Sequence, residues 1–282
     1  MVLALIRFLL DTFLIVVICK YVLVKYLRKL AEVLNLKAKT VGNIAGIATS
    51  IPELLTVSFS AFTGYIQTGL YNILSSNTIN LILYSISILA HKNGKLIRQN
   101  RGLQIEILLA VITILIPIVM LVGAVETSFV LVPFLLLLYG IIRVIDQKAH
   151  KKYLEQEETE LLEEIQQEEK KVQQTEQKKG WLYGGIIVVV MVILFFIGNH
   201  LSDILEELAG KFQLPEFLLG ALLGFATSIP ELMTFFEAQS FHQEEDEKLG
   251  VVEATNNLLA SNILCLCIIQ SIGIVIFTIV KH

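Results

Sequence analysis

Long apolar stretches recur from one end of this chain to the other, and they restrict its fold more than any other feature. A helix needs about 20 apolar residues to cross a hydrocarbon layer about 30 Å thick. With 55% hydrophobic and only 17% charged residues, the sequence predicts an all-α polytopic membrane protein with about eight transmembrane helices. The predicted spans lie near 2–27, 40–64, 69–91, 102–123, 126–146, 180–199, 214–239 and 250–280.

Charged residues between the apolar stretches predict the orientation of the chain. The links after the first and third stretches are rich in basic residues and should face the cytoplasm. The links near 64–69 and 123–126 carry almost no charge, so we expect both termini outside. The first stretch is too long for a signal-peptide core and should remain as a spanning helix. Short loops and compact size favour a prokaryotic plasma membrane.

Residues 147–179 differ from the rest of the chain because charged residues and Gln dominate them. Basic residues flank both ends of this segment, as is usual for cytoplasmic links. We therefore predict a charged, solvated cytoplasmic linker. It separates a first membrane repeat at 1–146, with about five helices, from a second at 180–282, with about three.

An internal repeat relates the two sides of this linker. Residues 47–56 read IATSIPELLT and residues 225–234 read FATSIPELMT, so eight of ten positions are identical. A second echo follows each copy, NILSSN at 72–77 and NLLASN at 257–262. The two helix pairs lie at 40–91 and 214–280, and an odd number of spans separates corresponding helices. They should run in opposite directions, as in the inverted repeats of secondary transporters.

Glu53 and Glu231 occupy the same position in the two copies, each inside an apolar span. An acidic side chain at a helix centre costs roughly 2.5–3.5 kcal/mol on insertion scales, so both need a compensating partner. A protonated or lysine-paired structural carboxylate is the alternative, but the four predicted spans at 40–64, 69–91, 214–239 and 250–280 contain no Lys or Arg. We therefore predict cation binding. Pro52 and Pro230 support this prediction, because each leaves a carbonyl of the preceding turn without its amide partner.

Hydroxyl groups accompany both glutamates. Thr49 and Glu53 are four residues apart, as are Thr227 and Glu231, so each pair lies on one helix face. Oxygen ligands of this kind suit calcium or sodium. The alternative is that hydroxyl groups bond back to their own helix. Further candidate oxygen ligands are Ser50, Ser228, Ser76, Asn80 and Ser261.

Other small and polar residues in these spans have a structural interpretation. Small residues allow membrane helices to approach closely, and amide side chains bond between them. The glycines expected at close helix contacts are Gly42, Gly46, Gly220 and Gly224. The asparagines that we favour as interhelical bonds, with a ligand role as the alternative, are Asn77, Asn256, Asn257 and Asn262.

These motifs resemble those of the cation/calcium exchanger superfamily, the sodium/calcium exchangers and their microbial relatives. The stretches from Gly46 to Glu53 and from Gly224 to Glu231 are similar to the family's Gly-x-x-Thr-Ser-x-Pro-Glu signature. The resemblance extends to a Ser-Asn-x-x-Asn/Asp segment at 76–80 and 261–265. It implies that Glu53 and Glu231 are the central carboxylates of a transport site. The implied oxygen partners are Thr49, Ser50, Thr227, Ser228, Ser76, Asn80 and the carbonyls of Gly46 and Gly224.

The chain departs from the resembled family in two ways. Relatives commonly have ten spans, so we expect either that two helices are dispensable or that a partner, a second copy or a helper subunit, supplies them. Cys265 stands where those relatives have an acidic or amide side chain. A thiol is a soft and weakly hydrogen-bonding group, so one quadrant of the site is expected to be poor in oxygen.

We therefore expect an antiporter that exchanges calcium for sodium ions or protons by alternating access. A membrane sensor or partner subunit that binds a cation without transporting it is the alternative, and a channel is a weaker one. The expected partners are membrane lipid and inorganic cations, and no cofactor is expected. A pI near 5.8 offers no basic surface for nucleic acid. No metal-protease, phosphate-loop or nucleophile-elbow pattern indicates an enzyme.

Overall fold

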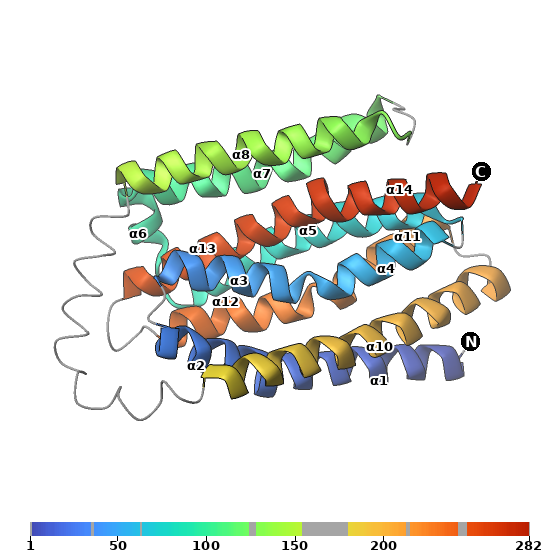
Figure 1. Cartoon of the computed structure of the whole chain (residues 1–282), viewed down its shortest axis with the longest axis horizontal. Helices are drawn as coiled ribbons and strands as arrows, with labels where there is room; N and C mark the ends of the chain where they lie inside the picture. Colours follow the sequence, from blue (N-terminus) through green and yellow to red (C-terminus); the bar gives the residue numbers. More distant parts are fainter. Residues whose placement is uncertain are drawn as a thin grey trace.

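The computed structural model describes residues 2–34, 37–62, 64–123, 128–153, 180–212, 215–241 and 247–281. The regular structure in these ranges is helical, and the long helices lie side by side as a bundle (Figure 1). This confirms the predicted all-α fold. The first half comprises α1 (Val2–Ile18), the π-helical η1 (Cys19–Leu23), α2 (Val24–Leu34), α3 (Ala38–Thr49), α4 (Ile51–Phe62), α5 (Ile66–Ala90), α6 (Gly94–Gln99), α7 (Arg101–Val122) and α8 (Leu131–Tyr153). The second comprises α10 (Gly180–Phe212), α11 (Glu216–Thr227), α12 (Ile229–Phe241), α13 (Glu247–Ile263), the π-helical η4 (Leu264–Ile269) and α14 (Gln270–Lys281).

Within the described part of the chain, six helical segments are long and apolar enough to cross a membrane. They are Ala38–Phe62, Ile66–Ala90, Arg101–Val122, Gly180–Leu201, Glu216–Phe241 and Glu247–Lys281. The other two predicted spans correspond to α1–η1–α2 and to α8, whose second half carries Arg143 and Asp146. The number of eight transmembrane spans therefore remains a prediction.

Several helices continue past the predicted spans, beyond their apolar parts. The first predicted span ends near 27, but the helix continues through η1 and α2 to Leu34. The last predicted span of the first half ends near 146, but α8 runs into the predicted linker as far as Tyr153. Lys, Arg and Glu are good helix formers, so a change from apolar to charged residues does not end a helix. Residues 154–179 of the predicted linker lie outside the described residues.

Each copy of the duplicated motif folds as two helices with a break between them. The break falls at Ser50, between α3 and α4, and at Ser228, between α11 and α12. Pro52 and Pro230 lie two residues later and donate no amide hydrogen, so the ladder of helical hydrogen bonds is interrupted there. The predicted Pro-interrupted helices are confirmed. Each break leaves the following glutamate in the first turn of a new helix.

The two broken helices run in opposite directions (Figure 1). α3–α4 starts at the end of the bundle that holds α6, whereas α11–α12 returns toward that end. α3 packs along α13, and α11 packs along α5. The broken helix of each repeat therefore lies against the second helix of the other, and the predicted inverted repeats are confirmed. The start of α1 and the end of α14 lie at the same end of the bundle, opposite α6 (Figure 1).

Glycines make these two helix contacts possible. A Cβ atom on Gly46 would lie 2.7 Å from the carbonyl oxygen of Asn257 and 2.9 Å from the amide nitrogen of Ser261. A Cβ atom on Gly224 would lie 2.7 Å from the amide nitrogen of Ser76. These neighbours are backbone atoms, which no rotamer change can move aside. The predicted close approach is confirmed, and the two glycines one turn earlier are equally crowded.

Two groups of helices flank the crossed repeats. α7 and α8 form a hairpin on one side, and α10 lies with α1 and α2 on the other (Figure 1). Apolar side chains fill both sets of contacts. The centre, where the two breaks lie, is instead lined by buried polar side chains. The fold thus encloses its polar residues between the repeats and away from lipid.

Candidate cation-binding site

Glu53 and Glu231 lie in the first turns of α4 and α12, and neither side chain is exposed. The helix breaks put each carboxylate at a helix N-terminus, where free amide groups and the helix dipole favour negative charge. The two carboxylates lie close enough to interact electrostatically. The structure thus brings together the two acidic residues that the repeat singles out.

Serines from the second helix of each repeat bind both carboxylates. Ser76 on α5 donates a hydrogen bond to Oε1 of Glu53 at 2.9 Å, and Ser261 on α13 donates to Oε1 of Glu231 at 3.1 Å. The same two hydroxyl groups also join the repeats. Ser76 lies 3.1 Å from the hydroxyl oxygen of Ser228, and Ser261 lies 2.8 Å from that of Ser50. Four predicted serines and both glutamates therefore form two matching clusters.

The two threonines bond back to their own helices. Thr49 donates to the carbonyl of Ala45 at 2.9 Å, and Thr227 donates to that of Leu223 at 3.0 Å. Their hydroxyl hydrogens therefore bond back to their own helices, as the alternative considered from the sequence predicted. Their oxygens remain available as acceptors, since a hydroxyl oxygen has two lone pairs. Each threonine lies next to the carboxylate of the other repeat, Thr49 beside Glu231 and Thr227 beside Glu53.

Gly46 and Gly224 lie in the last turns of α3 and α11, beside the site. The carbonyl of Gly46 accepts from the amide of Ser50 at 3.3 Å and from its hydroxyl at 2.7 Å. The carbonyl of Gly224 accepts from the amide of Ser228 at 3.1 Å. Both carbonyls already have donors, so they are weaker ligand candidates than the carboxylates.

Several buried oxygens in this centre have no hydrogen-bond donor among the described residues. They include the second carboxylate oxygen, Oε2, of both Glu53 and Glu231 and the amide oxygen of Asn80. A buried acceptor without a partner costs about 1–3 kcal/mol, and a charged one costs more. A sodium or calcium ion needs such oxygens, because it binds several at once. These atoms therefore fit a transported cation as substrate.

Asparagines join the repeats as interhelical bonds. The side-chain amide of Asn77 donates to the carbonyl of Asn262 at 3.1 Å, and Asn262 returns the bond to the carbonyl of Asn77 at 3.2 Å. This reciprocal pair follows the approximate twofold symmetry of the two repeats. For these two asparagines the interpretation that we favoured from the sequence is confirmed.

The sequence reasoning did not assign roles to Thr56 and Asn72, which support the site. The Asn72 amide donates to the hydroxyl oxygen of Thr56 at 2.7 Å, and Thr56 donates to the backbone carbonyl of Glu53 at 3.1 Å. Asn257 and Thr234 form the same chain in the other repeat, ending on the carbonyl of Glu231. The recurrence of both residues in the repeat was the signal that could have identified them.

Comparison with known proteins places the chain in a family. The sequence matches the family described as "Sodium/calcium exchanger protein" over residues 3–145 and 182–282. The chain therefore belongs to the sodium/calcium exchanger family. This confirms the resemblance seen in the two motifs. No curated protein matches the sequence.

Solved structures of the sodium-calcium exchanger NCX_Mj have a similar fold. One, soaked with 2.5 mM Na+ and 0.1 mM Ca2+, is 19% identical with a TM-score of 0.55, over 98% of this chain and 83% of that one. Another, soaked with 100 mM Na+ and 10 mM Sr2+, is 19% identical with a TM-score of 0.56 over the same shares. At this identity the likeness concerns the fold alone.

This member of the exchanger family has an asymmetric centre. In the first repeat, Asn80 donates to the hydroxyl oxygen of Ser261 at 3.4 Å and to the side-chain oxygen of Asn262 at 3.2 Å. The equivalent position in the second repeat is Cys265, which is buried in an apolar cluster with Val57 and other residues. The described residues contain no group of three or more His, Cys, Asp or Glu side chains suited to a metal ion.

Proposed function

We propose that this chain is an antiporter that exchanges calcium for sodium ions or protons, with Glu53 and Glu231 as the central ligands. One observation carries the proposal. Two buried glutamates from inverted repeats lie between matching serine clusters, and each keeps one oxygen that accepts no hydrogen bond from the described residues. A site built equally from two inverted repeats suits alternating access, in which one repeat moves against the other around a central site.

The charges of the site suit this exchange. Two carboxylates balance one calcium ion or two monovalent ions, so either load leaves the buried centre neutral. The proposed neutral ligands are Thr49, Ser50, Ser76, Asn80, Thr227, Ser228 and Ser261, with the carbonyls of Gly46 and Gly224 in support. Such an oxygen cage favours calcium over magnesium, because magnesium needs a small, rigid octahedral shell and loses water reluctantly. On this proposal the chain is a transporter and not an enzyme.

The proposed orientation puts both termini outside and the 147–179 segment in the cytoplasm of a prokaryotic cell. It is supported by the start of α1 and the end of α14, which both lie at the end of the bundle opposite α6 (Figure 1). Basic residues flank the other end, which is usual for the cytoplasmic side. The proposed organisation keeps a first membrane repeat at 1–146 and a second at 180–282. A second copy or a helper subunit is a proposed partner.

The second candidate function is a membrane protein that binds a cation without transporting it. Cys265 favours this candidate, because a buried thiol among apolar residues offers no hard oxygen to the ion. On this candidate the protein binds the cation but does not carry it across the membrane.

Transport in vesicles separates the two candidates. The purified protein is reconstituted into lipid vesicles loaded with sodium, or with acid, and calcium uptake is followed when each gradient is imposed. An antiporter gives uptake that stops when the gradient is dissipated by an ionophore. Calcium binding to the protein without gradient-driven uptake would favour the non-transporting candidate.

Replacing the buried thiol with a carboxylate tests what limits calcium use. In Cys265→Asp we expect the calcium concentration for half-maximal uptake to fall about tenfold, because a third carboxylate adds a hard ligand beside the other two. Cys265→Ser, which replaces the sulfur with a neutral oxygen at the same position, is the control and should change little. Weaker calcium use in Cys265→Asp would contradict a ligand position here.

A further inference from the structure

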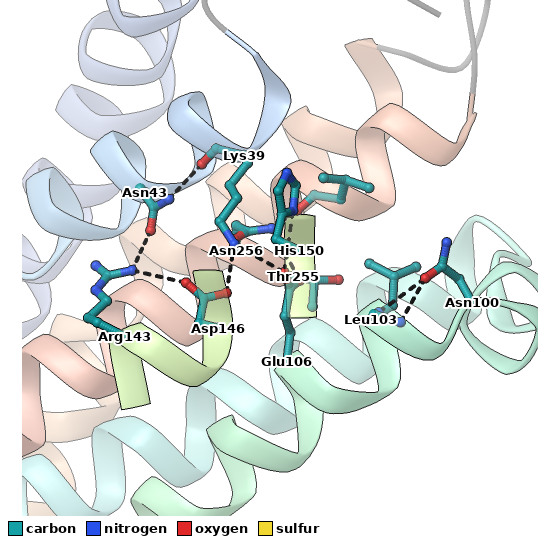
Figure 2. Close-up of polar contacts among 12 residues, drawn as sticks. Lys39, Asn43, Asn100, Leu103, Glu106, Arg143, Asp146, His150, Thr255 and Asn256 are labelled. Carbon is teal, nitrogen blue, oxygen red and sulfur yellow. Dashed lines mark hydrogen bonds and ion pairs between the residues drawn. The ribbon is translucent and has the colours of Figure 1, made fainter. Parts of the chain in front are cut away.

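A second group of buried charges lies away from the cation site, toward the end of the bundle that holds α6. Its centre is the carboxylates of Glu106 on α7 and Asp146 on α8, which are 0% and 1% exposed. The ammonium group of Lys39 on α3 donates to Asp146 Oδ1 at 2.7 Å and lies 3.5 Å from Glu106 Oε1. Figure 2 shows Lys39 reaching between these two acids. Lys39 lies just before the span predicted to begin near 40, and α3 begins at Ala38.

Further bonds extend this group to four helices (Figure 2). Asn256 on α13 donates to Oε2 of Glu106 at 3.2 Å. Arg143 on α8 donates to the side-chain oxygen of Asn43 on α3 at 2.8 Å and lies 3.6 Å from Asp146. His150 on α8 lies 3.8 Å from Glu106. The group therefore ties the α7–α8 hairpin to α3 and α13 together.

The charges of this group balance within the protein. Lys39 and Arg143 supply two positive charges, and Glu106 and Asp146 supply two negative ones. Because a lysine already lies between the two acids, the group is not a second cation site. A buried ion pair is seldom more stabilising than apolar packing. We therefore expect this group to fix one arrangement of the helices rather than to add stability.

Among the described residues, no equivalent group of buried ion pairs occurs where α11 crosses α5 at the opposite end of the bundle. The repeat relates Lys39 to Phe217 and Asn256 to Tyr71. Those two aromatic rings meet edge to face, with centroids 6.5 Å apart. At that end the crossing is held by this aromatic contact and by the amide and hydroxyl of Thr68, which donate to Glu216 at 3.1 and 3.2 Å, whereas buried ion pairs hold the other end. The ion pairs are therefore not a general requirement of the crossing and need a separate explanation.

Both helices held by this group continue directly to the cation site. Lys39 precedes Thr49 by ten residues on α3, a distance of about 15 Å along the helix. Asn256 precedes Ser261 by five residues on α13, or about 7.5 Å. A shift of either helix would separate Ser50 from Ser261, whose hydroxyl oxygens are 2.8 Å apart.

We propose that Lys39, Glu106 and Asp146 form an ionic lock that holds α3 and α13 against the α7–α8 hairpin and so positions Ser50 and Ser261 at the cation site. These are positioning residues, since none of them touches the site itself. The contacts alone support the positioning of the helices, whereas the expected effect on calcium binding rests on the proposed function.

Hydrogen exchange of the full chain in lipid nanodiscs tests the lock directly. In Lys39→Met and Asp146→Asn we expect amide exchange to rise about tenfold in α3 and α13 as well as in α7 and α8. Faster exchange confined to α7 and α8 would mean that the charges merely pack the hairpin, and would overturn the proposal. Lys39→Arg keeps the charge and should restore slow exchange in α3.

A milder variant is needed if Lys39→Met or Asp146→Asn fails to fold because it leaves a buried charge unpaired. Asn43→Ala keeps all four charges and removes the bond from Arg143 to α3, together with the bond from the Asn43 amide to the carbonyl of Lys39 in the same helix. Exchange should then rise in α3 and stay unchanged in α7, whereas unchanged exchange in α3 would count against the lock. Phe217→Leu, at the equivalent position of the other end, is the matched control and should leave the amides of residues 38–43 unaffected.

Calcium uptake in the same variants connects the lock to transport. Lys39→Met should raise the calcium concentration for half-maximal uptake about tenfold, because misplaced ligands bind the ion less well, while Phe217→Leu should not. If the wild-type protein takes up no calcium, the proposed function fails and the exchange pattern still decides the lock. If the wild type transports and exchange in α3 and α13 is unchanged by the variants, the lock alone is wrong.

Discussion

Replacing either Glu53 or Glu231 with glutamine should nearly abolish gradient-driven calcium uptake. Each substitution keeps the size of the side chain and removes one of the two charges that balance a divalent ion. We expect the calcium affinity to fall about 100-fold, which corresponds to roughly 2.7 kcal/mol of binding free energy. The measurement is calcium uptake into sodium-loaded vesicles, together with the rise in melting temperature that calcium produces in the purified protein.

Glu237→Gln provides the matched control for these two variants. Glu237 lies on α12, the same helix as Glu231, but its side chain is exposed. Its replacement should leave uptake unchanged. Because glutamine is neutral and easier to bury, the two site variants should fold at least as stably as the wild type without calcium. Normal uptake in both Glu53→Gln and Glu231→Gln would disprove the assignment of the site.

The second large effect is expected from a single methyl group at the crossing of the repeats. Gly46→Ala places a Cβ atom 2.7 Å from the carbonyl oxygen of Asn257 and 2.9 Å from the amide nitrogen of Ser261. The backbones of α3 and α13 must then separate, which should lower the free energy of unfolding by about 2 kcal/mol. The separation should also weaken calcium binding, because Ser50 and Ser261 move apart. Thermal unfolding in detergent measures the first effect.

Gly140→Ala is the control, because a Cβ atom on Gly140 in α8 meets nothing within 4 Å. Alanine forms helices better than glycine, so this variant should be as stable as the wild type or about 0.5–1 kcal/mol more stable. If Gly46→Ala proved as stable as Gly140→Ala, the close helix contact would not be a requirement of the fold.

Some parts of the site could be predicted because they depend on local sequence. Hydropathy located the helices, since the cost of burying a residue in lipid depends mainly on its type. Proline located the breaks, because the missing amide hydrogen acts within one turn. The duplicated motif identified Glu53 and Glu231, and the number of spans between its copies predicted their opposite directions.

Other parts depended on residues far apart in the chain. Ser50 and Ser261 are 211 positions apart and meet only because glycines let α3 and α13 approach closely. Lys39 resembled an ordinary basic residue at a helix end, and no local pattern related it to Asp146, 107 positions later. Glu106 did leave a signal, as a lone acid within an apolar span, but its partner could not be chosen from the sequence.

The sequence by itself determined a membrane bundle of helices, two broken inverted repeats and the pair of acids at their centre. Each of these follows from residue type and spacing, which act over a turn or a span. The tertiary structure alone decided which repeat supplies each partner of those acids and where the buried charges of α3, α7 and α8 meet. Those contacts depend on how closely and at what register the helices cross, and crossing is set by the packing of the whole bundle.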